Sequence, residues 1–138
     1  MSKFHFQPIK EKADEILKAI LQTPELASCS MKDVMVIRLA CEEVVVNITS
    51  YAYPDDAEGY LDLEIEAVND RIMLRFIDGG TPFNPFEHEM PDTTQSWEER
   101  RIGGLGIFLV FKKMDDVRYA YENNQNILTI EKIINQNR

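Results

Sequence analysis

The feature that most constrains the fold is a long segment, roughly Met31 to Tyr51, that contains neither glycine nor proline. Its apolar side chains recur at steps of three and four residues, at Val34, Ile37, Cys41, Val44 and Ile48. Side chains at this spacing lie on one face of a helix, so the segment is predicted to be a helix with one buried face. Ser30, three residues before Asp33, fits an N-terminal cap, and the turn signal at 54–56 is expected to end the helix.

Two polar residues lie on a neighbouring face of this predicted helix. Glu43 and Asn47 are four residues apart, so their side chains lie one turn above each other, after Val36 and Leu39 on the same stripe. Burying a carboxylate and an amide without partners is unfavourable by several kcal/mol. They are therefore either a pair satisfied on the helix or the polar end of a pocket. In a pocket, Asn47 suits a neutral oxygen ligand for Mg²⁺, and Glu43 suits a base for water or a hydroxyl.

The composition and net charge of the chain exclude some kinds of function. The 138 residues are 44% hydrophobic and 28% charged, which fits one globular domain, 1–138. The net charge of -9 argues against direct binding of nucleic acid or of an anionic membrane, and a phosphate site would have to be local and metal-assisted. Cys29 and Cys41 lack metal-binding spacing and fit a reduced, cytosolic protein. With neither a membrane-spanning run nor a signal-peptide core, a cytoplasmic location is expected.

The other segments predict a sheet covered on one face. Their spacing predicts strands over 3–7, 60–68, 72–78, 117–121 and 127–134. It also predicts helices over 9–21 and 107–114. In 60–68 the alternation predicts a buried face with Leu61, Leu63, Ile65 and Ala67. Because most neighbouring strands are joined by hairpins, the fold class is α+β, with a mixed, mostly antiparallel sheet and helices packed on one face. The stretch 83–101 has no sustained period, which is typical of a functional lid.

Asp78 ends a predicted strand just before Gly79 and Gly80. A carboxylate at such a strand end can accept a hydrogen bond from an exocyclic amine, and Gly80 leaves room for a flat ring beside it. The alternative is a simple turn, which Asp-Gly pairs mark more often than ligand sites. Taken alone, the pair favours the turn.

A glycine cluster opens the predicted helix at 107–114. Gly103, Gly104 and Gly106 let backbone amides approach an anion at a helix N-terminus, although a flexible joint would have the same composition. The pattern is neither a Walker loop nor the usual dinucleotide fingerprint. Arg101, just before the cluster, could contact phosphate oxygens or lie in solvent.

The combination of these motifs resembles the GHKL ATPase superfamily. The chain carries Glu-x-x-x-Asn at 43–47, Asp-x-Gly at 78–80 and Gly-Gly-x-Gly at 103–106, which correspond to the N box and the two glycine boxes of the Bergerat fold. The sequences around these boxes, over about residues 3 to 134, are similar to those of the anti-sigma-factor serine/threonine kinases of the RsbW kind.

The resemblance implies a full set of roles. Asn47 would coordinate Mg²⁺ bound to ATP, Glu43 would be the general base, and Asp78 would bind the adenine amine with Gly80 beneath the ring. The phosphates would be held by Arg101, Gly103, Gly104, Leu105 and Gly106, under a lid at 83–101. Members of this family phosphorylate a small anti-sigma-factor antagonist, bind a sigma factor and commonly form homodimers. The alternatives are a non-catalytic ATP/ADP-binding partner-switching module and a bare protein-interaction domain.

Overall fold

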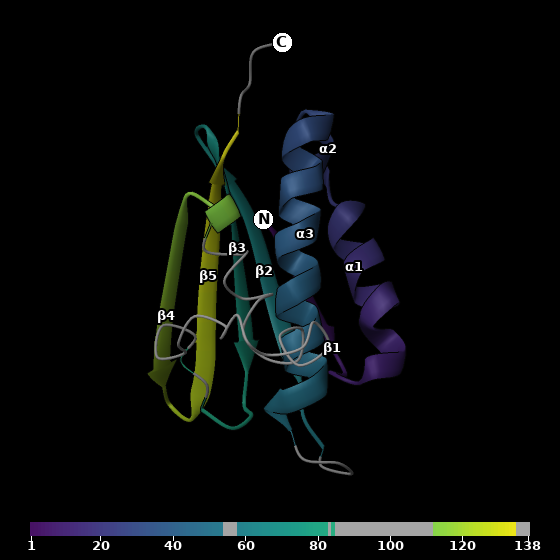
Figure 1. The fold of residues 1–138 in the computed structure, drawn as a ribbon, viewed down its shortest axis with the longest axis vertical. Coiled ribbons are helices and arrows are strands. Elements are labelled where there is room, and N and C mark those ends of the chain that lie inside the picture. Colours follow the sequence, from purple (N-terminus) through teal and green to yellow (C-terminus); the bar gives the residue numbers. More distant parts are fainter. Residues whose placement is uncertain (54–57, 83, 85–111, 135–138) are drawn as a thin grey trace, which may run out of the picture.

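The computed structural model describes residues 1–53, 58–82, 84 and 112–134 (Figure 1). The strands are β1 (Ser2–Phe6), β2 (Leu61–Val68), β3 (Arg71–Asp78), β4 (Asp116–Glu122) and β5 (Gln125–Ile133). The helices are α1 (Ala13–Leu21), α2 (Pro24–Ala27) and α3 (Met31–Asn47), with a 3-10 turn at Lys10–Lys12 and a π-helical turn at Ile48–Ala52. The predicted lid at 83–101 and the predicted helix at 107–114 lie outside the described residues, apart from Asn84 and residues 112–114.

The strands form one sheet in the order β1-β2-β3-β5-β4. All four pairings between these strands are antiparallel. Helices α1 and α3 lie across one face of the sheet (Figure 1). The predicted α+β class with helices on one face is therefore confirmed. Among the described helices, none is long and apolar enough to cross a membrane.

The tight turns are made by asparagines in the left-handed region. Asn69 links β2 to β3 with a φ of 56°, and Asn123 and Asn124 link β4 to β5 with φ values of 53° and 62°. Asparagine tolerates this conformation better than most residues, and two-residue hairpins require it. These turns set the register within each hairpin, where Val68 pairs with Arg71 and Glu122 pairs with Gln125.

Helix α3 buries most of the predicted face, although Val34 near its start is only half buried. Ile37, Cys41 and Val44 are at most 1% exposed. They join a core that includes Ile16 and Ile20 of α1, Leu61, Leu63 and Ile65 of β2, and Ile72, Leu74 and Phe76 of β3. The Oγ of Ser30 accepts a hydrogen bond from the backbone N–H of Asp33 at 3.1 Å, so the predicted cap is confirmed.

Three local features differ from the sequence prediction. Pro24 ends the first helical region as expected but also begins α2, because proline suits the first turn of a helix. Ala67 is exposed rather than buried, since it lies beside the hairpin turn at the end of β2. The winding continues past Asn47 to Ala52 as expected, but as a π-helical turn.

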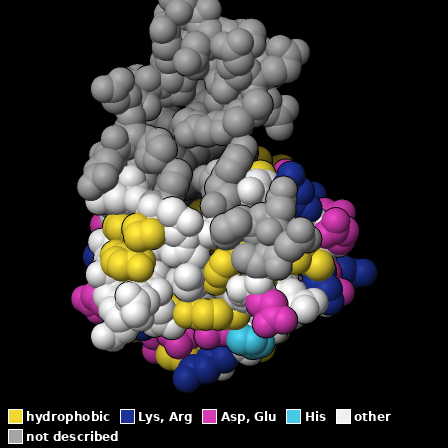
Figure 2. All heavy atoms as spheres, turned by 90° about the horizontal axis from the view of Figure 1, so that it is seen from below, with side chains coloured by type: hydrophobic (Ala, Val, Ile, Leu, Met, Phe, Trp, Pro, Cys, Tyr) yellow, Lys and Arg dark blue, Asp and Glu magenta, His cyan; other side chains and the backbone are white. Residues whose placement is uncertain are grey.

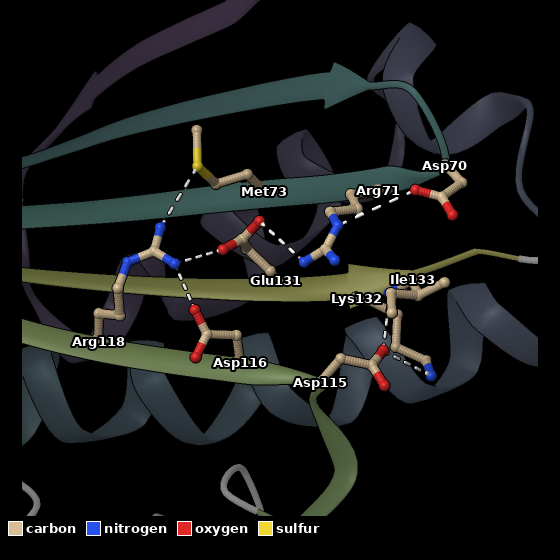
Figure 3. A network of polar contacts seen from close by, with 9 residues as sticks. All are labelled: Asp70, Arg71, Met73, Asp115, Asp116, Arg118, Glu131, Lys132 and Ile133. Carbon is tan, nitrogen blue, oxygen red and sulfur yellow. Dashed lines mark hydrogen bonds and ion pairs between the residues drawn. The ribbon is translucent and has the colours of Figure 1, made fainter.

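The face of the sheet opposite the helices carries ion pairs (Figure 3). Glu131 of β5 lies between Arg118 of β4 and Arg71 of β3, with 3.7 Å between Arg71 Nη1 and Glu131 Oε1. Arg118 also contacts Asp116 on its own strand. Both arginines are about half exposed, so each pair contributes about 1 kcal/mol or less to stability.

Cys41 should be protected from thiol reagents in the folded protein. Its side chain is 0% exposed, and burial raises the pKa of its thiol to about 12. The reactive thiolate is therefore scarce near neutral pH. Cys29 is only half buried, although burial raises the pKa of its thiol too. Ellman's reagent should label Cys29 slowly in native buffer and both thiols in denaturant. In a Cys29→Ser variant, prompt native labelling would contradict this packing.

Candidate functional site

Asp78 is a buried carboxylate at the C-terminal end of β3, with only 4% of its surface exposed. The side-chain Nδ2 of Asn126 donates to its Oδ1 at 3.0 Å. The backbone N–H of Gly80 donates to the same oxygen at 2.9 Å. Its Oδ2 accepts no hydrogen bond from the residues that the structure describes. Among the described residues, donors thus fix one oxygen of the carboxylate, and none of them occupies the other.

The charge state of Asp78 follows from opposing effects. Burial raises the pKa of the carboxyl, while the bonds from Asn126 and Gly80 lower it, with a net pKa above the ordinary value. Burying a carboxylate costs free energy unless donors compensate it. An exocyclic amine that donates to Oδ2 would add the missing donor, which is the chemistry expected for Asp78 from the sequence.

Asn126 is a site residue that sequence reasoning missed. It is 6% exposed on β5, and its Nδ2 also donates to the carbonyl oxygens of Thr81, at 3.0 Å, and Gly80, at 3.4 Å. The hydroxyl of Tyr119 on β4 donates to its Oδ1. The sequence did contain a sign of this role. Asn126 and Leu128 are two residues apart on β5, so their side chains point to the same, inward face of the sheet.

Tyr53 is a second residue that the sequence did not single out. Its hydroxyl donates to the carbonyl oxygen of Tyr60 at 2.8 Å, and it accepts from the N–H groups of Tyr60, at 3.1 Å, and Gly79, at 2.7 Å. Gly59 lies against the ring, where an added Cβ would come closer than 3.0 Å. Tyr53 therefore ties the segment after α3 to the entry of β2 and to the turn after Asp78.

The end of α3 and the end of β3 meet at Gly80. The N–H of Thr81 donates to the carbonyl oxygen of Ala52 at 2.8 Å. A Cβ on Gly80 would lie closer than 3.0 Å to that same carbonyl oxygen. Gly80 is therefore needed for close packing of two backbones, a reason that the sequence alone does not show.

Glu43 and Asn47 lie on the last turns of the same helix, and both side chains are half buried. Asn47 precedes Ile48, which begins the π-helical turn that leads to Ala52 and the contact with Gly80. The structure thus places the end of α3 that carries Asn47 beside the turn that follows Asp78. The remaining predicted site residues, Arg101, Gly103, Gly104, Leu105 and Gly106, lie outside the described residues.

The surface at this end of the molecule carries hydrophobic side chains together with basic and acidic ones (Figure 2). Among the described residues, no group of three or more His, Cys, Asp and Glu side chains could hold a metal ion. The predicted Mg²⁺ ligand, Asn47, is a hard oxygen ligand of the type that Mg²⁺ accepts, and the other ligands would be phosphates and water.

Comparison with known proteins defines the class. The family model of the histidine kinase-like ATPase domain matches residues 6–132. The chain therefore belongs to this family. A likeness in structure agrees with this result: the histidine kinase domain of the blue-light activated histidine kinase from Erythrobacter litoralis EL346 superposes with a TM-score of 0.56 at 16% sequence identity, covering 90% of this chain and 60% of that one. The predicted fold is thereby confirmed.

Within this family, the chain is similar to proteins named serine-protein kinase RsbW. The protein of Listeria monocytogenes (serovar 1/2a) is 29% identical over 104 residues, which cover 72% of this chain and 66% of the relative. The protein of Staphylococcus epidermidis is 31% identical over 112 residues, which cover 78% of this chain and 70% of the relative. The chain thus spans about two thirds of the length of these relatives.

Replacing Tyr53 by Phe should destabilise the fold modestly. The change leaves the ring in place against Gly59 but removes the hydroxyl that joins Tyr60 to Gly79. Because water can reach the N–H of Gly79, we expect a loss of about 1 kcal/mol in the free energy of unfolding. Urea denaturation measures it. A matched Tyr121→Phe change, at an exposed position on β4, should have no effect, and equal losses would contradict the role of Tyr53.

Proposed function

We propose that this chain is an ATP- and Mg²⁺-dependent serine/threonine protein kinase that acts as an anti-sigma-factor-type regulator. It would transfer the γ-phosphoryl group of ATP to a hydroxyl of a small antagonist-like protein. A sigma factor would be a second protein partner, and a homodimer is the expected assembly. Direct contact with nucleic acid or a membrane is not part of the proposal.

The observation that carries the proposal is the buried Asp78. Its Oδ1 is held by Asn126 and by the N–H of Gly80, and its Oδ2 has no hydrogen bond from the described residues. In a member of an ATPase family, a carboxylate with one oxygen left for a ligand supports recognition of the adenine amine. Membership of the family itself supports ATP as the ligand.

The kinase step is supported by two further facts. The relatives at about 30% identity are named serine-protein kinases. The side chains of Glu43 and Asn47 lie one turn apart near the end of α3 that meets the turn after Asp78. In the proposed reaction, Asn47 holds Mg²⁺ on the phosphates and Glu43 accepts the proton of the attacking hydroxyl. Arg101, Gly103, Gly104, Leu105 and Gly106 would hold the phosphates.

A second candidate is a nucleotide-binding partner-switching module without kinase activity. The observation that favours it is coverage, because the matched stretch spans only 66% of the Listeria relative. Activity of the whole relative therefore does not transfer automatically to this chain. Both candidates require nucleotide binding, whereas only the kinase transfers phosphate.

Binding is tested first, by thermal unfolding with ATP in the presence of Mg²⁺ or of a chelator. At a hundredfold excess over the dissociation constant, a bound nucleotide adds about 2.7 kcal/mol to the free energy of unfolding. We expect Mg²⁺ to strengthen this effect in the wild type but much less in an Asn47→Ala variant. No stabilisation of the wild type by any adenine nucleotide would exclude both candidates.

Phosphate transfer separates the candidates. With radiolabelled ATP and candidate antagonist proteins, we expect label on a serine or threonine of one of them. Glu43→Gln should lower the transfer rate about a hundredfold, because a positioned general base contributes at least that factor. The matched control is Glu42→Gln, which makes the same change at an exposed position one residue earlier on α3. Undiminished transfer in Glu43→Gln would remove Glu43 from its role, and binding without transfer would favour the second candidate.

A further inference from the structure

We propose that Asn126, oriented by Tyr119, is a positioning residue that presents one oxygen of Asp78 to the ligand and thereby makes the site select adenine over inosine nucleotides. Adenine carries an exocyclic amine where the base of inosine carries an oxo group. The proposal rests on the proposed function only in that the ligand is a purine nucleotide. It adds a residue that sets the specificity through Asp78, without touching the base itself.

The orientation of the Asn126 amide follows from the chemistry of its neighbours. Nδ2 faces the carboxylate Oδ1 of Asp78 and the carbonyl oxygens of Gly80 and Thr81, which are all acceptors. The reversed amide would place oxygen against all three. On the other side, the hydroxyl of Tyr119 donates to Oδ1 of Asn126. The amide is therefore held with its donor toward Asp78.

This orientation fixes which oxygen of Asp78 a ligand meets. Oδ1 already accepts from Asn126 and from the N–H of Gly80, so the plane of the carboxylate is set by two donors from different strand ends. The remaining acceptor, Oδ2, complements an amine and opposes an oxo group. In a buried site, an unmatched acceptor is strongly unfavourable, and sites built on such hydrogen bonds discriminate by large factors.

Selection also requires that Asp78 stays ionised, because a protonated carboxyl could donate to an oxo group. Asn126 and the N–H of Gly80 are neutral donors that favour the ionised form against burial. Among the described residues, the titratable groups around the carboxyl are the phenols of Tyr53 after α3, of Tyr60, whose ring lies beside Gly79, and of Tyr119 on β4, which reaches it through Asn126. Burial raises the pKa of Tyr53, so it remains neutral near neutral pH.

The test is an Asn126→Asp variant, which keeps the shape of the side chain but exchanges the donor for a second carboxyl. Two carboxyls about 3 Å apart cannot both ionise readily, so the pair retains a proton near neutral pH. We measure the dissociation constants of ADP and IDP by calorimetry at about pH 7, where both bases are neutral. The quantity of interest is the ratio of the IDP constant to the ADP constant.

In the wild type this ratio should be about a hundred or more. In Asn126→Asp, where the carboxyl pair retains a proton, the ratio should fall at least tenfold. If Asn126 had a purely structural role, the variant would bind ADP and IDP more weakly by the same factor. The ratio would then be unchanged, and this result would overturn the proposal. The matched control is Asn124→Asp, which makes the same substitution at an exposed position in the adjacent turn and should not alter the ratio.

A second variant covers the case in which Asn126→Asp does not fold. Tyr119→Phe removes only the hydroxyl that orients the amide, and it should lower the ratio in the same direction by a smaller factor. A wild type that binds neither nucleotide would refute the proposed function. A wild type that selects ADP, with an unchanged ratio in the variants, would refute only the role of Asn126.

Discussion

ADP binding is expected to weaken about a hundredfold or more, and IDP binding to strengthen, when Asp78 is replaced by Asn. The reason is that two fixed donors decide how the new amide lies. Asn126 Nδ2 and the N–H of Gly80 both point at the position of Oδ1, so they hold the amide oxygen of residue 78 there. Its NH₂ group then occupies the position of Oδ2, where it opposes an exocyclic amine and complements an oxo group.

The measurement is calorimetric titration of ADP and IDP, each with Mg²⁺, into the wild type and Asp78→Asn. Asp70→Asn is the matched control, because it removes the same charge from the exposed hairpin turn at the other end of β3. If the affinities for ADP and IDP fell by the same factor, Asp78 would support the fold without contacting the base. Unchanged ADP binding would place the base elsewhere. Only an inverted preference agrees with the geometry around Oδ2.

The parts of the fold that follow from local sequence were predictable. The face of α3 with Ile37, Cys41 and Val44 follows from helical spacing, and its cap at Ser30 follows from a known preference. The hairpins follow from asparagines in short turns between alternating segments. Helix α2, by contrast, has four residues, too few for any periodicity to appear.

The candidate site was predictable only in its residue types. Asp78 could be a turn residue or a ligand, and its position at the end of β3 does not decide between them. The sequence also does not show the bond from Asn126, which lies 48 residues later in the chain and shares Oδ1 of Asp78 with the N–H of Gly80. That contact depends on β5 pairing with β3 rather than only with β4, its hairpin partner. The register between strands that are far apart in the sequence cannot be predicted from a local sequence pattern.

Tyr53 and Gly80 illustrate the same limit. The hydroxyl of Tyr53 reaches Gly79, 26 residues away, and no short motif connects the two. From the sequence, Gly80 was interpreted as leaving room for the ring of a ligand. The structure gives a second reason for glycine, because the carbonyl group of Ala52 lies where a side chain would be. The two explanations are compatible, but only the second predicts a loss of stability in the absence of nucleotide.

Replacing Gly80 by Ala should therefore lower the free energy of unfolding by about 3 kcal/mol or more, even without ligand. The added Cβ would lie closer than 3.0 Å to the backbone oxygen of Ala52, which cannot move away by changing a rotamer. Relief requires separating the end of β3 from the turn after α3, and this breaks the 2.8 Å bond between Thr81 N–H and Ala52. The φ of Gly80 is not positive, so alanine can adopt the same backbone conformation and the loss of stability would come from the contact of its Cβ.

Gly79→Ala is the matched control, one residue earlier. Its Cβ would meet the ring of Tyr60 at 2.9 Å, and a side chain can shift where a backbone cannot. Urea denaturation should therefore show a clearly smaller loss for Gly79→Ala, and the melting temperature of Gly80→Ala should fall by about 10 °C or more. Equal stabilities of the two variants would show that β3 and the end of α3 do not approach this closely. The surfaces that carry Asn47 and Asp78 would then no longer be held side by side.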